Sequence, residues 1–196
     1  MKMSYRKLAL ILLFVVLAVV IFGFFVIKTY TTNKEPENKM LIVFYSHTGN
    51  AQFVSEQIQA ITGADIFELI AVDPYPEDVN ATIERAGQER EEGVLPSLAG
   101  RIDNLNDYDI IFLGTPNWFG TLSLPMQSFL GSYDLSGKTI VPFITFGGGG
   151  IMNTITDLKM LAPNATILEE FGVSRDDVKN SRSDIAQWLE RIGIHK

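Results

Sequence analysis

Residues 46–50, SHTGN, follow the apolar run LIVFY and carry groups that can bind an anion. The hydroxyl groups of Ser46 and Thr48 can donate hydrogen bonds, and Gly49 lets the backbone approach a ligand closely. If a helix begins near Ala51, the free amides of its first turn and its dipole also favour negative charge there. The segment is therefore a candidate anion site without Lys or Arg. Ordinary capping of the helix by Ser or Thr is the alternative, and spacing alone does not separate the two.

Residues 115–121, TPNWFGT, form a second candidate segment directly after the apolar run DIIFLG. Trp118 and Phe119 are adjacent, and both cannot enter the core from so short a loop. Asn117 and Gly120 are expected to keep the backbone irregular. An aromatic side chain at the ligand edge of a sheet typically supports a flat ring of the ligand. The alternative is a small aromatic cluster packed on neighbouring loops.

Residues 147–150 are four consecutive glycines between the apolar run TIVPFITF and an amphipathic segment that starts near Ile151. A lone glycine run can be a flexible linker. Between a buried strand and a helix, it instead lets bare backbone approach a ligand closely. The three segments together predict one crevice with an anion-binding end, an aromatic side and a glycine side.

Five apolar runs from Met40 onward predict the strands that position these loops. The predicted strands are residues 41–45, 65–70, 109–114, 139–146 and 165–171. Several are apolar almost throughout, which is typical of strands buried on both faces of a parallel sheet. Because they alternate with helical patterns, we expect an α/β fold with helices on both faces of the sheet. Ligands bind such sheets beyond the carboxyl ends of the strands, where the three loops stand.

Helices are predicted where apolar residues recur every three or four positions. These stripes are Val54, Ile58 and Ile61; Met126, Phe129, Leu130 and Tyr133; Ile151, Ile155, Leu158 and Leu161; and Ile185, Trp188, Leu189 and Ile192. Trp188 is therefore assigned to the core. Residues 78–92 are helical but mostly polar beyond Ile83, which predicts a surface helix between the second and third strands. Tyr75, just before it, either folds over the crevice or occupies a turn.

Composition narrows the classes of partner. Residues 40–196 carry 10 Lys or Arg and 21 Asp or Glu, a net charge of −11. Nucleic acid and anionic lipid would be repelled by such a domain, so neither is expected as a partner. The absence of Cys excludes disulfides, thiolate catalysis and Cys-ligated metals. With only two His residues, no metal site or Ser/His triad can be assembled, and no metal is expected.

The N-terminal part of the chain differs from the rest. Residues 8–27 are an uncharged apolar run, and at about 1.5 Å per residue they span roughly 30 Å, the thickness of a bilayer's hydrocarbon core. We expect an uncleaved transmembrane anchor rather than a signal peptide, because the run is long and no small-x-small cleavage site follows it. Residues 28–39 are polar and predict a linker that spans roughly 20 Å.

The orientation of this anchor depends on the basic residues beside it. Residues 1–7 and residues 28–39 each contain three Lys or Arg, so their numbers give no bias. The tight cluster in the basic flank 1–7 favours a cytoplasmic N-terminus. The sequence thus predicts a single-pass protein of the cell membrane, with residues 40–196 outside the cytoplasm.

The three loops together also carry a family resemblance. The S-x-T-G-N loop, the segment TPNWFGTLSLPMQSFL and the segment TFGGGG resemble the flavodoxin family, from about Met40 to the C-terminus. The SHTGN loop combined with the WFGT motif is specific, whereas the tetraglycine alone is weak. The resemblance implies a doubly wound, five-stranded parallel sheet of order 2-1-3-4-5 in residues 40–196. It also implies that FMN is the cofactor.

This resemblance assigns cofactor-binding residues to each loop. The FMN 5′-phosphate would contact Ser46, His47, Thr48, Gly49, Asn50 and Ala51. The isoalloxazine ring would lie beside Pro116, Asn117, Trp118, Phe119 and Gly120, and its other edge would meet Thr145, Phe146, Gly147, Gly148, Gly149 and Gly150. In flavodoxins a peptide near the flavin N5 can rotate on reduction, and Gly120 would permit this because it lacks a Cβ.

The sequence departs from the family pattern at one face of the ring. Many flavodoxins stack a Tyr of the third loop on the flavin, where this chain has only glycine. One face is therefore predicted to be open. An open face would allow a quinone or a nicotinamide to stack on the flavin and receive a hydride.

Two functions follow from these features. The first is a membrane-tethered FMN protein that carries single electrons between protein redox partners, because negative charge near the reduced ring should lower the potential of the second electron. The alternative is an FMN-dependent reductase of quinones or other planar acceptors, although the chain has no G-x-G-x-x-G fingerprint. An interaction module that has lost its cofactor is a third class. The intact Ser46, Thr48, Gly49 and Trp118 argue against it.

Overall fold

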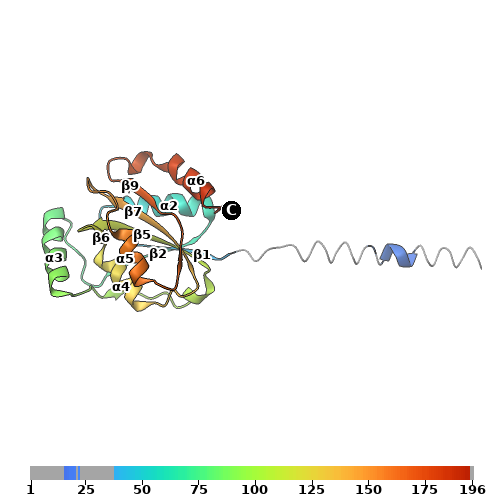
Figure 1. The fold of residues 1–196 in the computed structure, drawn as a ribbon, viewed down its shortest axis with the longest axis horizontal. Coiled ribbons are helices and arrows are strands. Elements are labelled where there is room, and N and C mark those ends of the chain that lie inside the picture. The colour runs from blue at the N-terminus through green and yellow to red at the C-terminus, as the bar shows by residue number, and fades with distance from the viewer. Residues whose placement is uncertain (1–15, 21, 23–37, 195–196) are drawn as a thin grey trace, which may run out of the picture. The chain divides into compact units, whose positions relative to one another are not determined.

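The computed structural model describes residues 16–20, 22 and 38–194 (Figure 1). From Asn38 onward the described residues form one compact unit. This unit contains all three candidate loops, so the fold and the site are described within it.

The predicted N-terminal segments fall mainly outside the described residues. Within the predicted anchor, residues 8–27, only 16–20 and 22 are described, and these are helical. The basic flank 1–7 and nearly all of the linker 28–39 lie outside the described part. In the portion of the chain that the structure describes, no helix has the length and apolar character needed to cross a membrane.

A parallel sheet forms the centre of the compact unit, as Figure 1 shows. Its strands are β1 (Met40–Phe44), β2 (Asp65–Glu68), β5 (Ile110–Trp118), β7 (Thr139–Phe146), β8 (Thr166–Ile167) and β9 (Phe171–Ser174). They follow the order β2-β1-β5-β7-β8, and β9 also pairs with β7. The predicted order 2-1-3-4-5 is confirmed, with the fifth strand divided into β8 and β9.

Helices cover both faces of this sheet because successive strand residues point to opposite sides. On β1, Ile42 and Phe44 face the core cluster that contains the apolar residues of α2 (Asn50–Thr62) and α6 (Arg182–Arg191). Leu41 and Val43 face the other cluster, which includes residues of α4 (Leu124–Ser132) and α5 (Thr154–Leu161). Trp188 of α6 is only 1% exposed, so its predicted place in the core is confirmed.

The sheet is tightly packed at Gly114 in β5. A Cβ built on Gly114 would lie 2.1 Å from Cζ of Phe143 and 2.8 Å from Cβ of Phe44. No larger residue fits without displacing these side chains, because protein interiors are close-packed. This contact fixes β5 between its neighbours just before the aromatic segment.

Between β2 and β5 the chain makes an excursion with its own small sheet. Its elements are β3 (Ile70–Ala71), α3 (Val79–Glu92), β4 (Leu98–Ala99) and the short helix η1 (Leu105–Asp107). Outside this excursion, a second short helix, η2 (Val178–Asn180), precedes α6. Strands β3 and β4 pair antiparallel. Asp78 caps α3 by accepting a hydrogen bond from the amide of Ala81 (2.9 Å), which is a typical N-cap contact. Only Thr82 and Ala86 of α3 are buried, so the predicted surface helix is confirmed.

Two predicted boundaries near the site are corrected by the structure. β5 continues through Trp118 and pairs antiparallel with β6 (Thr121–Leu122), so the expected loop 115–121 is largely a strand and a hairpin. The helix expected near Ile151 begins at Thr154 instead. Met152 has a φ of 44°, and this left-handed backbone cannot continue a right-handed helix.

Candidate functional site

A cavity of about 420 Å³ lies beyond the carboxyl ends of β1, β5 and β7. Its volume falls within the range of roughly 300–1,000 Å³ that is usual for small-molecule sites. The three candidate loops all contribute to it, as the sequence predicted. The predicted residues on its wall are His47, Thr48, Asn50, Pro116, Asn117, Trp118, Phe119, Thr145, Phe146 and Gly147.

The other predicted residues belong to the same loops but are not on the cavity wall. They are Ser46, Gly49, Ala51, Gly120, Gly148, Gly149 and Gly150. Ala51 is buried beneath the loop at 1% exposure. Ser46 instead lines a smaller neighbouring hollow of about 170 Å³, together with Glu68 and Tyr75.

The anion-binding end of the cavity is the segment from Ser46 to the start of α2. No side chain caps α2, and its first turn contains no acidic residue. Because the first intrahelical hydrogen bond is donated by the amide of Phe53 to Gly49 (3.0 Å), the preceding amides of the first turn have no helical acceptor. The side-chain amide of Asn50 donates to Oγ1 of Thr48 (3.2 Å). This end of the cavity thus offers hydroxyl and amide donors without a basic residue.

His47 connects this loop to α3. Its Nε2 lies 3.3 Å from Oγ1 of Thr82. The hydroxyl of Thr82 donates to the carbonyl oxygen of Pro76 (2.6 Å), so its oxygen is left to accept a hydrogen bond. This arrangement requires the proton of a neutral His47 to be on Nε2.

The aromatic side of the cavity is centred on Trp118. Its ring lies edge-to-face against Tyr75 (5.0 Å between centroids) and Tyr45 (5.5 Å), and against His47 (6.2 Å). Burial raises the pKa of Tyr45 to about 12. Burial, followed by the hydrogen bond to Glu89, also raises the pKa of Tyr75. Both phenols therefore remain protonated and uncharged at neutral pH.

The ring of Phe119 lies beside α3, so the two adjacent aromatic side chains have different neighbours. A Cβ on Gly87 of α3 would lie 3.7 Å from the ring of Phe119. The guanidinium carbon of Arg90 lies 5.5 Å from the ring centroid, within the range of a cation–π contact. Phe119 is 42% exposed, whereas Trp118 is partly buried against the core. The prediction that both cannot enter the core is confirmed.

Residues 117–122, named here the aromatic hairpin, turn through Phe119 and Gly120. The pairs Asn117–Leu122 and Trp118–Thr121 place these two residues in a two-residue turn. Both have positive φ, 54° and 84° respectively, as a type I′ turn requires. This turn directs Trp118 and Phe119 to opposite neighbours.

A family model described as flavodoxin matches residues 39–192. The chain belongs to the flavodoxin family. Its sheet order and the position of its cavity agree with this membership.

Individual relatives agree with this membership. A candidate flavoprotein from Bacteroides eggerthii superposes with a TM-score of 0.69 at 29% identity, over 80% of this chain and 98% of that one. A flavoprotein from Lactobacillus acidophilus, crystallised with FMN, superposes with a TM-score of 0.60 at 24% identity, over 77% of this chain and 98% of its own. The latter likeness is one of fold.

A sequence relative carries the name of an enzyme. The NAD(P)H dehydrogenase (quinone) of Syntrophobacter fumaroxidans is 26% identical over 134 residues, which are 66% of this chain and 63% of that protein. The chain therefore spans less than two thirds of that relative's length.

One wall of the cavity was not predicted from the sequence. Four residues of α3 line it, and they are Val79, Thr82, Ile83 and Ala86. Their spacing of three, four and seven positions places them on one face of the helix. This periodicity was available in the sequence, but the surrounding polar residues hid it. The surface helix is thus also a wall of the site.

Arg175 was missed as well. It follows β9 and is the only Lys or Arg on the cavity wall within the described residues. Its backbone amide donates to the carbonyl oxygen of Phe146 (2.8 Å), which holds it beside the glycine side. The place of Arg175 after a strand of the sheet was the signal that could have identified it.

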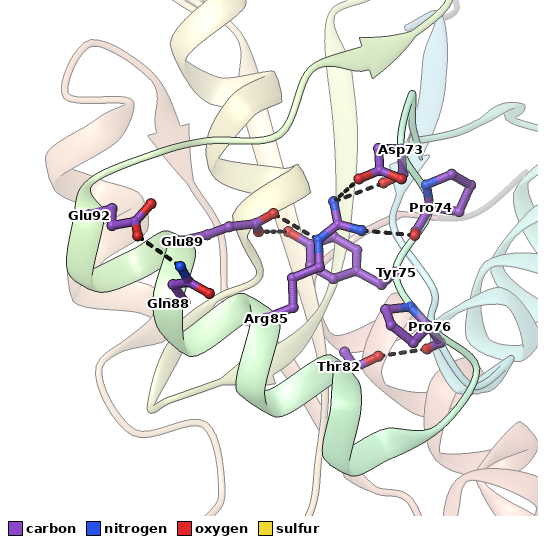
Figure 2. A network of polar contacts seen from close by, with 9 residues as sticks. All are labelled: Asp73, Pro74, Tyr75, Pro76, Thr82, Arg85, Gln88, Glu89 and Glu92. Atoms are coloured by element: carbon purple, nitrogen blue, oxygen red, sulfur yellow. Dashed lines mark hydrogen bonds and ion pairs between the residues drawn. The ribbon is translucent and has the colours of Figure 1, made fainter.

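A polar network holds α3 to the segment before it (Figure 2). The hydroxyl of Tyr75 donates to Oε2 of Glu89 (2.5 Å), and Nε of Arg85 donates to Oε1 of the same carboxylate (2.9 Å). Arg85 also donates to the carbonyl oxygens of Pro74 (2.9 Å) and Asp73 (3.1 Å). Since α3 buries little apolar surface, this network is its main attachment.

Proposed function

We propose that this protein binds FMN in the 420 Å³ cavity and carries single electrons between redox partners. The observation that carries the proposal is the combination, in one cavity, of an anion-binding end and a slot for a flat ring. The first is formed by the loop before α2, and the second by the part of the wall that contains Trp118 and Gly147. FMN has a phosphate at one end and a planar ring at the other.

The residues at the anion-binding end fit a phosphate. Among the described residues, Oγ of Ser46 is the buried side-chain polar atom that lacks a hydrogen-bond partner. Leaving a buried donor unpaired is costly, so such an atom indicates a missing partner. The uncapped amides at the start of α2 likewise lack acceptors. Thr48 and these amides would hold the phosphate from the cavity wall, and Ser46 would contact it from the adjoining hollow that it shares with His47.

The residues at the other end fit a flat ring. Trp118 provides an aromatic surface on the cavity wall, and Gly147 leaves its own part of the wall without a side chain. When bound, FMN supplies a ring that can accept and release one or two electrons. The protein's own part is to hold the ring at the edge of the sheet, where a redox partner can approach it.

The charge distribution favours one-electron transfer. The domain from residue 40 carries a net charge of −11, which opposes the accumulation of a second negative charge at the ring. Arg175 offsets this only in part, because its side chain is 66% exposed and water screens it. We therefore expect the second electron to enter at a lower potential than the first.

The FMN assignment can be tested with Thr48→Val, which keeps the shape of the side chain and removes its hydroxyl. Loss of a hydrogen bond to a charged group costs about 1.5–3 kcal/mol, so FMN affinity should fall roughly tenfold or more. Riboflavin lacks the phosphate, and its affinity should not change. An equal loss of affinity for both ligands, or no loss for either, would contradict the assignment of the phosphate to this loop.

The electron-carrier assignment needs a separate measurement. A potentiometric titration of the full chain loaded with FMN should show two well-separated midpoint potentials. A single two-electron step would contradict the carrier function and support the alternative below.

A second function, reduction of quinones or other planar acceptors, is favoured by the wall that α3 adds to the cavity. Val79, Ile83 and Ala86 give that wall an apolar surface, and a flat uncharged acceptor would bind such a surface. The relative named NAD(P)H dehydrogenase (quinone) supports the same alternative. Turnover of NAD(P)H with a quinone would support this function, and Ile83→Glu should then slow the turnover. Absence of turnover leaves the carrier function.

We also propose that residues 8–27 tether this domain to a membrane, with the domain outside the cytoplasm and its redox partners in or near the bilayer. The uncharged run of twenty apolar residues supports the tether. The full chain should remain in the membrane fraction after an alkaline wash. A chain without residues 1–37 should be released and should still bind FMN. Release of the full chain by the wash would contradict the tether.

A further inference from the structure

The side chain of Asn117 makes its hydrogen bonds to other parts of the protein. Its Nδ2 donates to the carbonyl oxygens of Gly150 (3.1 Å) and Ile151 (3.0 Å). The same nitrogen also lies 3.2 Å from Oγ1 of Thr154, and Oδ1 accepts from the amide of Gly120 (2.9 Å). An amide nitrogen has two hydrogens, which these three acceptors share. Although Asn117 lines the cavity, its side chain therefore has no donor left for a ligand.

These bonds join the aromatic hairpin to residues 147–153, named here the glycine turn. The carbonyl oxygen of Gly120 accepts from the amide of Asn153 (2.9 Å). The hydroxyl of Thr121 donates to the carboxylate of Asp157 just beyond the turn. Asn117 lies at the centre of this set, because it alone among these residues bonds both to the hairpin and to the glycine turn through one side chain.

Both joined segments contain backbone conformations that need support. Within the described residues, the non-glycine residues with positive φ are Phe119 in the aromatic hairpin and Met152 in the glycine turn. Such conformations persist only where the surrounding structure holds them. The bonds of Asn117 meet both segments within a few residues of these positions. Asn117 is thus placed to hold the two strained turns in register.

We propose that Asn117 is a positioning residue that sets the separation of the aromatic hairpin and the glycine turn. Both segments contribute to the cavity wall, the hairpin through Trp118 and the glycine turn through Gly147, so their separation sets the space available to a flat ring. The identity of that ring rests on the proposed function, whereas the tie between the segments does not. Asn117 acts on the ring end of the cavity and leaves the phosphate end untouched.

The test compares Asn117→Asp and Asn117→Ala with the control Asn164→Asp, which makes the same charge change at an exposed position. In Asn117→Asp a carboxylate would face the carbonyl oxygens of Gly150 and Ile151 and would repel them. The affinities of FMN and riboflavin should both fall, by roughly tenfold or more, because small displacements of a binding group have large effects. Their ratio should stay at the wild-type value, unlike in Thr48→Val.

Two further readouts separate positioning from general destabilisation. Both Asn117 variants should change the separation of the two flavin midpoint potentials and the visible absorption band of the bound flavin, whereas Asn164→Asp should not. In the full chain without FMN, the amides of Gly120 and Asn153 should exchange hydrogen faster, while amides of β5 keep their protection.

Several outcomes would overturn the proposal. Unchanged affinities with unchanged exchange at Gly120 would show that Asn117 does not hold the slot. Loss of folding in both variants would make it a folding residue instead. If the wild-type chain failed to bind FMN, the proposed function would fail. The exchange measurement without FMN would then still decide whether Asn117 ties the two segments.

Discussion

The attachment of α3 is expected to depend on the carboxylate of Glu89, and Glu89→Gln tests this. The carboxylate has two oxygens, of which one accepts from Tyr75 and the other from Arg85. An amide offers only one oxygen, so one of these two donors loses its acceptor. Tyr75 is buried, and the side chain of Arg85 is only 25% exposed, so water replaces the lost bond incompletely.

The expected cost follows from these contacts. A hydrogen bond to a charged group contributes about 1.5–3 kcal/mol, and the partial exposure of Arg85 and Glu89 places the loss near the lower end. Since α3 buries only Thr82 and Ala86, the cost should appear as local opening of the helix. About 1.5 kcal/mol corresponds to roughly tenfold faster exchange of its amides.

Hydrogen exchange of the amides of α3, with those of β5 as an internal reference, measures this effect. Glu92→Gln is a matched control, because Glu92 accepts only from the exposed side chain of Gln88 (2.9 Å; Figure 2). Such pairs contribute about 0.2–0.5 kcal/mol, so exchange should change about twofold or less. Equal exchange in the two variants would refute the role of Glu89. Equal acceleration in α3 and β5 would show that α3 does not open separately.

Three other substitutions test the packing, the ionisation and the turn beside the site. Gly114→Ala should lower the free energy of unfolding by about 1–3 kcal/mol, because its Cβ would overlap the ring of Phe143; an unchanged Tm would contradict this. Burial raises the pKa of Tyr45 to about 12 from 10.0, so its contribution to stability is present below pH 10 and is lost as the pH rises towards 12. Urea unfolding of Tyr45→Phe should accordingly depend less on pH in this range. Gly120 has a φ of 84°, and a Cβ added there would lie 3.2 Å from Sδ of Met152. Gly120→Ala should therefore weaken flavin binding, as measured by fluorescence titration. Wild-type affinity would show that the hairpin tolerates a Cβ.

The sheet could be predicted closely because its signals are local. Residues 139–146 were predicted as a strand, and β7 has the same bounds. Continuous apolar runs identify strands buried on both faces, and amphipathic stripes identify the helices that cover them. The apolar stripe of α5 was less reliable, since Leu161 is 44% exposed and Ile151 lies outside the helix. The left-handed backbone at Met152, which ended this pattern, has no local signal.

The aromatic hairpin shows why a motif does not define its own geometry. Two-residue turns of this type usually have Asn or Gly at the first central position, but here Phe119 occupies it. Its ring lies beside Gly87 and Arg90 of α3, which are about thirty residues earlier in the chain. Tertiary contacts therefore override the local preference of the turn, and the sequence pattern alone predicted a loop.

The sequence by itself determined that the three loops lie along one edge of the sheet, and with it the location of the site. This follows because parallel strands place all their carboxyl ends together. It also identified the donors around Ser46 and the aromatic pair that begins with Trp118. Only the tertiary structure decided that α3 is a wall of the cavity, that His47 bonds to Thr82, and that Asn117 serves the protein rather than a ligand. These contacts join residues more than thirty positions apart, so their geometry is set by how the whole fold packs and not by any local pattern.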